Sequence, residues 1–153
     1  MTQDMKITTI NPAMAFQKPL EDYIQYLEKM NLRSLPLLEK LAVPGVHYTH
    51  PLHDVRGRDA MMDIFRQRLN GERQKFTVTD HAWSRDGQTV YLRWQLRSLD
   101  NGAEDITNGV AEVLFTNDGQ VMAHNDFADA LYQLPPRPTI WSRLKKRYGG
   151  KRP

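Results

Sequence analysis

The chain has 153 residues, of which 40% are hydrophobic and 25% are charged, with 9 Gly, 9 Pro and a net charge of +3. This composition is typical of one folded domain and excludes collagen-like, coiled-coil and disordered proteins. The lack of Cys excludes disulfides, thiolate metal sites and cysteine nucleophiles. Because no apolar run approaches the ~20 residues of a membrane span and no signal-peptide pattern is visible, we expect a cytoplasmic protein.

The N-terminal half predicts helices. Residues 1–18 show no sustained period and predict an arm. Ser34 is placed to cap a helix, and the stretch 46–50 could form a short strand. Apolar residues at helical spacing predict three helices, at 21–30, 35–41 and 57–69.

From residue 76 onward the apolar residues alternate instead. This alternation predicts antiparallel strands at 76–83, 89–97, 105–115 and 120–131, separated by glycine turns. Helices followed by strands predict an α+β fold, in which a cone of three N-terminal helices packs on a curved, mainly antiparallel sheet. Prolines at 135, 136 and 138 end the pattern, so we expect the domain to span 19–133.

The last 20 residues, 134–153, form a basic tail with seven Lys or Arg and no acidic residue, which leaves the rest of the chain with a net charge of −4. A basic segment that contains Trp141 could form a short helix on an anionic membrane surface, or remain a solvated terminus. We do not expect nucleic acid as a partner, because the charge belongs to an appendage and not to a folded face.

Two short motifs carry a resemblance to a known family. Residues 47–60 (HYTHPLHDVRGRDA) lead into the third predicted helix, and residues 119–129 (GQVMAHNDFAD) form a glycine turn followed by the last strand. Their order and spacing resemble the SnoaL-like branch of the nuclear transport factor 2-like superfamily, with His50 where that family usually has Asp. The resemblance covers about residues 20–132.

The resemblance implies a bent sheet and helices that enclose a pocket, commonly in a homodimer. Members include ketosteroid isomerase, polyketide cyclases, limonene-epoxide hydrolase, scytalone dehydratase and several proteins without enzymatic activity, so the fold does not fix the function. One hypothesis is a protein that binds or acts on a small, mainly apolar molecule by cofactor-free acid/base chemistry of the isomerase, cyclase or dehydratase type. The alternative is a non-catalytic ligand-binding or dimeric assembly module.

His124 and Asp126 are the first candidates for proton transfer. They are two residues apart in a predicted strand, so their side chains leave the same face. The final-strand Asp resembles a catalytic acid of the epoxide-hydrolase relatives, and an apolar pocket that raises its pKa would make Asp126 and the imidazole a general acid/base pair. The same alternation also allows both side chains to face solvent, and a cavity lined by Asp126 would distinguish the two cases.

Tyr91, Arg93 and Gln95 share one face of the strand at 89–97. In the epoxide-hydrolase relatives an Arg-x-Asp at this place orients the attacking water, and here Gln95 replaces the Asp, so we do not expect epoxide hydrolysis by that mechanism. We expect Tyr91 and Gln95 to contact substrate. Arg93 could hold a substrate carboxylate or pair with Asp126, or form a structural ion pair. Glu112 could act as a base if it faces inward.

Three histidines, His47, His50 and His53, raise the question of a metal site, since imidazole is a common zinc ligand. Pro51 favours an extended segment, in which residues three apart face opposite sides, so we expect no metal. His50 is expected at the mouth of the pocket. Trp83 belongs either to the core or to the pocket wall, and we expect no cofactor.

Overall fold

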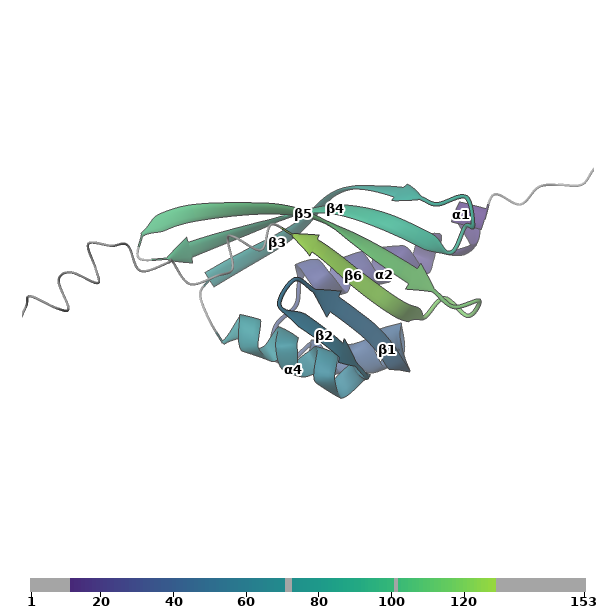
Figure 1. Cartoon of the computed structure of the whole chain (residues 1–153), viewed down its shortest axis with the longest axis horizontal. Coiled ribbons are helices and arrows are strands. Elements are labelled where there is room, and N and C mark those ends of the chain that lie inside the picture. The colour runs from purple at the N-terminus through teal and green to yellow at the C-terminus, as the bar shows by residue number, and fades with distance from the viewer. Residues whose placement is uncertain (1–11, 71–72, 101, 129–153) are drawn as a thin grey trace, which may run out of the picture.

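The computed structural model describes residues 12–70, 73–100 and 102–128 (Figure 1). The helical elements are α1 (Pro12–Ala15), α2 (Gln17–Glu28), the single-turn 3₁₀ helix η1 (Leu35–Leu37), α3 (Leu38–Leu41) and α4 (Arg58–Leu69). The strands are β1 (Ala42–His50), β2 (His53–Arg56), β3 (Arg73–Trp83), β4 (Thr89–Asp100), β5 (Ala103–Phe115) and β6 (Val121–Ala128). The predicted α+β class is confirmed.

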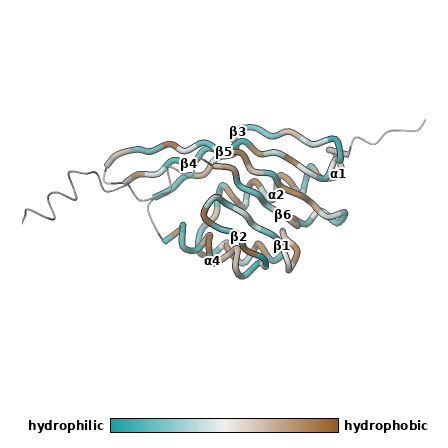
Figure 2. Tube along the Cα trace, in the orientation of Figure 1, coloured by the Kyte–Doolittle hydropathy of each residue, from teal (hydrophilic) through white to brown (hydrophobic). Residues whose placement is uncertain are grey.

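The strands form one sheet in the order β2-β1-β6-β5-β4-β3. Neighbouring strands are antiparallel except for β1 and β6, which run parallel and bring Tyr48 opposite His124. Figure 2 shows hydrophobic and hydrophilic residues alternating along the long strands, as expected for a sheet with one covered face. The mainly antiparallel character is therefore confirmed, with one parallel junction between β1 and β6.

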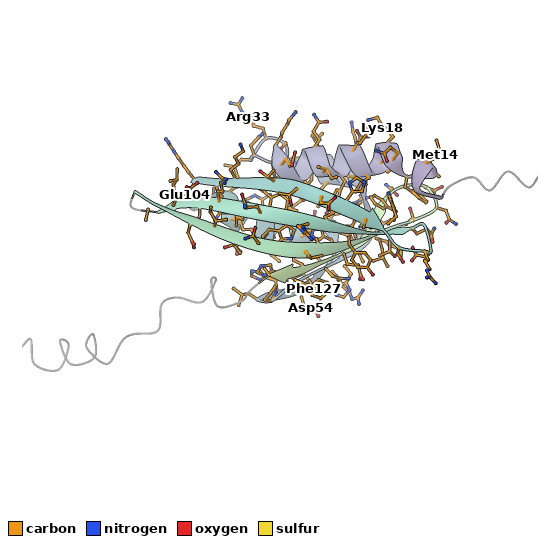
Figure 3. The ribbon with its side chains drawn as sticks, turned by 90° about the horizontal axis from the view of Figure 1, so that it is seen from above. Met14, Lys18, Arg33, Asp54, Glu104 and Phe127 are labelled. Atoms are coloured by element: carbon orange, nitrogen blue, oxygen red, sulfur yellow. The ribbon has the colours of Figure 1, made fainter. Side chains whose placement is uncertain are left out.

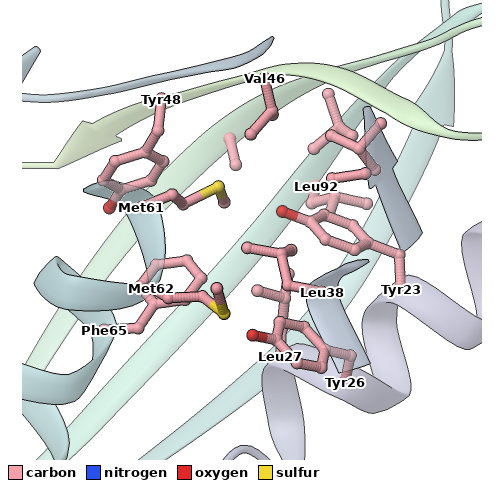
Figure 4. Close-up of a cluster of buried hydrophobic side chains, with 14 of the residues drawn as sticks. Tyr23, Tyr26, Leu27, Leu38, Val46, Tyr48, Met61, Met62, Phe65 and Leu92 are labelled. Atoms are coloured by element: carbon pink, nitrogen blue, oxygen red, sulfur yellow. The ribbon is translucent and has the colours of Figure 1, made fainter. Parts of the chain in front are cut away.

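The helices cover one face of this sheet, which we call the inner face; the opposite one is the outer face. α2 runs along the long strands and contacts β3, and α4 contacts β1 and β2 (Figures 1 and 3). Between helices and sheet lies one apolar core, part of which Figure 4 shows. Its largest contributors include Tyr23, Leu38, Met61, Phe65 and Leu92.

Gly57 fixes where α4 begins. It has a φ of 101°, a left-handed value that residues with a Cβ rarely adopt. Its N–H donates to the carbonyl of Val46 on β1 at 2.8 Å. The bond holds the start of α4 on β1, so that Met61 and Phe65, both buried, face the sheet.

Several elements differ from their predicted bounds. α2 starts at Gln17, within the predicted arm, because a helix tolerates Pro19 in its first turn. The second predicted helix is only η1 followed by one α turn, and the Ser34 hydroxyl caps neither but accepts the N–H of Asn31 at 2.9 Å. β2 had no counterpart in the sequence analysis.

Several expectations concern residues 129–153, which lie outside the described residues. They include the end of the last predicted strand, the proline boundary and the basic tail. In the part of the chain that the structure does describe, no helix has the length and hydropathy needed to cross a membrane.

Candidate active site

The strand register decides which side chains share a face. In antiparallel pairs, residues directly opposite each other point to the same side. Asp126 lies opposite Ala111, which lies opposite Leu92, and Leu92 is fully buried in the core. Asp126 therefore faces inward, as does His124 two residues before it.

His124 and Asp126 lie at the centre of a buried polar group that we call the Asp126 cluster. His124 is 2% exposed and Asp126 is 9% exposed. The Nε2 atom of His124 is 3.1 Å from Oδ1 of Asp126, and its Nδ1 atom is 2.7 Å from the Tyr23 hydroxyl. The Tyr48 hydroxyl donates to Oδ2 at 2.9 Å and accepts a bond from Nη2 of Arg68 at 2.8 Å. Side chains from α2, β1, α4 and β6 thus form one chain of hydrogen bonds that includes the Asp126 carboxylate.

The donor and acceptor properties of these groups determine which atoms of the cluster carry protons. An ionised carboxylate only accepts hydrogen bonds, so Nε2 of His124 carries a proton toward Asp126. The Nδ1 atom of His124 pairs with the Tyr23 hydroxyl, which donates to a neutral ring and accepts from a protonated one. Burial raises the pKa of Tyr23, and burial together with the charge of Asp126 raises the pKa of Tyr48, so both hydroxyls stay protonated.

The pKa of Asp126 lies below its ordinary value, which makes the expectation of a raised pKa wrong. Burial alone raises it, but three neighbours outweigh burial: the charge and hydrogen bond of His124, the charge of Arg68 and the hydrogen bond of Tyr48. Asp126 is therefore ionised at neutral pH, and its chemistry is that of a proton acceptor.

His50 lies beside this cluster, on the same face of β1 as Tyr48, and is 7% exposed. The backbone N–H of Leu52 donates to its Nδ1 atom at 3.2 Å. Burial lowers the pKa of His50 to about 4, and the charge of Arg68 acts in the same direction. The ring is neutral at pH 7 and its proton sits on Nε2, which makes His50 a hydrogen-bond donor next to Asp126.

Tyr91, Arg93 and Gln95 lie on the outer face, away from the Asp126 cluster. Arg93 is opposite Val110, and Val110 is opposite Phe127, whose side chain is 61% exposed. Phe127 lies on the side of the sheet away from α2 (Figure 3). Arg93 and Asp126 therefore lie on opposite faces of the sheet, and the expected pairing between them is not present.

Glu112 is also on the outer face. It lies opposite both Tyr91 and Asn125, and its Oε1 accepts the Asn125 amide at 3.0 Å. Asn125 separates His124 from Asp126 along β6 and so points the other way. The structure therefore does not bring Glu112 to the cluster.

Trp83 faces inward but at the opposite end of the sheet. Its ring centroid is 6.2 Å from that of Phe16 and 6.1 Å from that of Phe115. Phe115 lies opposite Val121, the first residue of β6, whereas Asp126 is near the end of that strand. Trp83 is partly buried and packs against the apolar core.

The three histidines do not converge. His47 is on the outer face, where its Nε2 atom is 2.7 Å from Oδ1 of Asp54. His50 and His53 lie opposite each other, with ring centroids 5.7 Å apart, and face inward. No three His, Asp or Glu side chains come together as metal ligands within residues 12–70, 73–100 and 102–128.

An open hollow of about 550 Å³ lies between the end of α2 and the end of α4. It is lined by Asn31, Leu32, Arg33 and Leu69. None of these residues belongs to the Asp126 cluster, so this hollow is not the cavity lined by Asp126 that the acid/base hypothesis expects.

Sequence reasoning missed three members of the cluster, Tyr23, Tyr48 and Arg68. Tyr48 is two residues before His50 in a strand, a spacing that places both on one face. Arg68 is three residues after Phe65 and seven after Met61, so it continues the buried stripe of α4. A charged residue in an apolar helical stripe was the available signal for Arg68.

A family model described as a SnoaL-like domain matches residues 21–124. None of the curated proteins compared with the chain matches it in sequence. Similar solved structures show the fold. A proposed SnoaL-like polyketide cyclase from Jannaschia sp. CCS1 is 16% identical, with a TM-score of 0.67 over 80% of this chain and 94% of that chain. An NTF2-like protein of unknown function from Exiguobacterium sp. 255-15 is also 16% identical, with a TM-score of 0.62 over 72% of this chain and 98% of that chain.

A third similar structure is the epoxide hydrolase/cyclase-like enzyme SalBIII, which has a role in pyran ring formation in the polyether salinomycin. It is 12% identical, with a TM-score of 0.65 over 77% of this chain and 93% of that chain. The family model covers about two thirds of the sequence, and the three structures share the arrangement of helices on a bent sheet. The chain therefore belongs to the SnoaL-like domain family and has the nuclear transport factor 2-like fold.

Proposed function

We propose that this chain binds a small, mainly apolar molecule on the inner face and carries out cofactor-free acid/base chemistry with Asp126 as the proton acceptor. The observation that supports this most is an ionised carboxylate in an apolar core, held by His124 and Tyr48. A buried charge costs free energy, and apolar residues of similar volume would stabilise the core at least as well. Such groups gather at functional sites.

Each residue of the cluster has its own role in the proposed reaction. Asp126 takes a proton from a carbon or hydroxyl group of the substrate, while His124 and Tyr48 fix the carboxylate in place. Return of that proton to another atom of the same molecule gives isomerisation or ring closure, and departure of water gives dehydration. His50, with its proton on Nε2, donates to an oxygen on which negative charge develops.

The relatives support the reaction class. Two of the similar structures are those of a proposed SnoaL-like polyketide cyclase and of an epoxide hydrolase/cyclase-like enzyme. The second of these has a role in pyran ring formation in the polyether salinomycin. For this chain the epoxide-hydrolase mechanism fits poorly, because Arg93 and Gln95 lie on the outer face.

The experiment begins with native mass spectrometry of the freshly purified protein, in which a retained metabolite would name the ligand. Activity is then measured on that metabolite, or as exchange of α-hydrogens for deuterium in a panel of ketones in D₂O. Asp126→Asn should slow the reaction by about 10²- to 10⁴-fold. The matched control is Asp54→Asn, which alters the exposed histidine–aspartate pair and should keep full activity. Full activity in Asp126→Asn would disprove the assigned role.

A non-catalytic binding module is the second candidate. The observation that favours it is that His124, Asp126, Tyr23 and Tyr48 already satisfy one another, while the open hollow lies elsewhere. A metabolite that is retained unchanged, with no α-hydrogen exchange above that of the Asp126→Asn variant, would support this candidate.

We also propose that two copies associate through the outer face. Neighbouring strands expose apolar side chains there: Tyr91 is 40% exposed, Val110 39% and Phe127 61%, and Val110 is directly opposite Phe127. Sedimentation of the full chain should show a dimer, and Phe127→Lys should shift it toward the monomer. A wild-type monomer at all concentrations would contradict the proposal.

A further inference from the structure

Trp94 holds a buried hydrogen-bond donor without a partner. The residue is 4% exposed and faces inward between Leu92 and Leu96 on β4. Its Nε1 atom is the one buried side-chain nitrogen or oxygen among the described residues that lacks a hydrogen bond. Burial of an unpaired N–H costs free energy, so such a group calls for an explanation.

Gly109 determines where this donor lies. Gly109 is directly opposite Trp94, and a Cβ atom at Gly109 would lie 2.2 Å from Cζ2 and 2.6 Å from Cε2 of the indole. Cε2 is bonded to Nε1, so the edge of the ring that bears the N–H lies over the backbone of β5. The ring also packs against Phe76, with centroids 5.4 Å apart. The indole therefore leans from β4 across β5, in the direction of β6.

Several small residues lie on the inner face beside this edge. Gly109 is opposite Ala128 on β6, and the neighbouring inner row pairs Ala111 with Asp126. The two rows are two residues apart, which is about 7 Å along a strand. Ala111 is fully buried, whereas Gly109 and Ala128 are half-buried. Since the indole already covers Gly109, the strip of small side chains between the buried donor and the Asp126 carboxylate consists of Ala111 and Ala128.

We infer that the Trp94 indole N–H, with this strip, is a binding subsite for an uncharged acceptor oxygen of a small aromatic or alicyclic molecule, such as a ketone oxygen. The molecule lies beside the indole, over Ala111 and Ala128, and its other end reaches Asp126. This placement rests on the proposed function. An uncharged oxygen fits because the donor is a neutral N–H packed on Phe76, whereas a carboxylate there would be a buried charge. Trp94 is in this view a specificity-determining residue.

The test uses two probes of the same shape, acetophenone and α-methylstyrene, in which a C=O group is replaced by C=CH₂. In ¹⁵N-labelled full-length protein, the indole signal that disappears in Trp94→Phe identifies Trp94. Acetophenone should move this signal and bind Trp94→Phe about fivefold more weakly than wild type, as expected for one lost neutral hydrogen bond. α-Methylstyrene should bind both proteins equally. The control is Tyr26→Phe, which removes a buried hydroxyl that does have a partner, the Leu35 carbonyl at 3.2 Å, and should leave the fivefold preference intact.

The inference is overturned if millimolar acetophenone leaves the Trp94 signal of the wild-type protein in place, or if Trp94→Phe binds acetophenone as tightly as wild type. The wild-type titration does not depend on whether a variant folds. Failure of the proposed function looks different: Asp126→Asn would keep full activity while the Trp94 signal still moved. A stationary Trp94 signal together with Asp126-dependent activity would remove only the subsite.

Discussion

The sheet carries two histidine–aspartate pairs, one on each face. On the inner face, His124 and Asp126 are 3.1 Å apart and their side chains are 2% and 7% exposed. On the outer face, His47 and Asp54 are 2.7 Å apart and their side chains are 27% and 76% exposed. The longer contact is the one that water cannot replace. The surroundings of a pair, more than its length, therefore determine what the pair contributes to stability and to chemistry.

The largest expected difference follows from truncating each aspartate. Asp126→Ala leaves the His124 N–H and the Tyr48 hydroxyl without their acceptor in the core, and should lower the free energy of unfolding by about 3 kcal/mol. Asp54→Ala should lower it by less than about 0.5 kcal/mol, because water replaces the exposed carboxylate. Urea denaturation at pH 7 measures both, and equal losses would contradict the comparison.

A second difference appears on lowering the pH. The pKa of His50 is about 4 in the folded protein and about 6.5 in the unfolded chain. Between these values the unfolded state binds more protons, so the contribution of His50 is complete above about pH 6.5 and is progressively lost toward pH 4. We expect a loss of about 2 kcal/mol between pH 7 and 4.5 that His50→Gln abolishes and His47→Gln, on the outer face, retains. Denaturation curves of the three proteins at several pH values test this, and a slope that survives His50→Gln would rule it out.

Tyr48→Phe should have a smaller effect, a loss of about 1.5 kcal/mol, because it removes the hydrogen bond to the Asp126 carboxylate and the acceptor of the Arg68 guanidinium. The pKa of Asp126 should rise toward its ordinary value, because one of the groups that lower it is gone. In wild type, the contribution of Asp126 is present above its unfolded pKa of about 3.9 and is lost as the pH falls through the lower folded value. Carboxyl ¹³C titration should therefore show a higher midpoint for Asp126 in the variant; an unchanged midpoint would mean that Tyr48 does not hold the carboxylate.

The smallest expected effect is that of salt. At 1 M NaCl the contribution of the exposed His47–Asp54 pair, within about 0.5 kcal/mol, should be screened out. The cost of Asp126→Ala should stay the same, since the inner pair is shielded from ions. Repeating the urea series at low and high salt measures both, and a salt-dependent cost of Asp126→Ala would show that the inner pair is reached by solvent.

Much of the sheet could be predicted from the sequence, because local alternation decides it. The strand at 89–97 shows Val90, Leu92 and Trp94 on one side, and all three are buried. The glycine turns between the strands were also visible. β2 was missed because its four residues are too few to establish a period.

The site was predictable only in part, because it depends on which face is covered and on long-range pairing. Spacing shows that His124 and Asp126 share a face and that Arg93 shares one with Tyr91. It does not show that the two sets are on opposite faces, which follows from the register of β4, β5 and β6. The lowered pKa of Asp126 likewise depends on Arg68, which comes from a different element.

The parallel junction of β1 with β6 also has a consequence for synthesis on the ribosome. Tyr48 reaches Asp126 across 78 residues of chain, and Tyr23 reaches His124 across 101. Until β6 has left the ribosome, the nascent chain lacks Asp126 and His124. The hydroxyls of Tyr23 and Tyr48 therefore cannot yet form their hydrogen bonds to these two residues. These contacts therefore form in one step, when the last strand docks on β1.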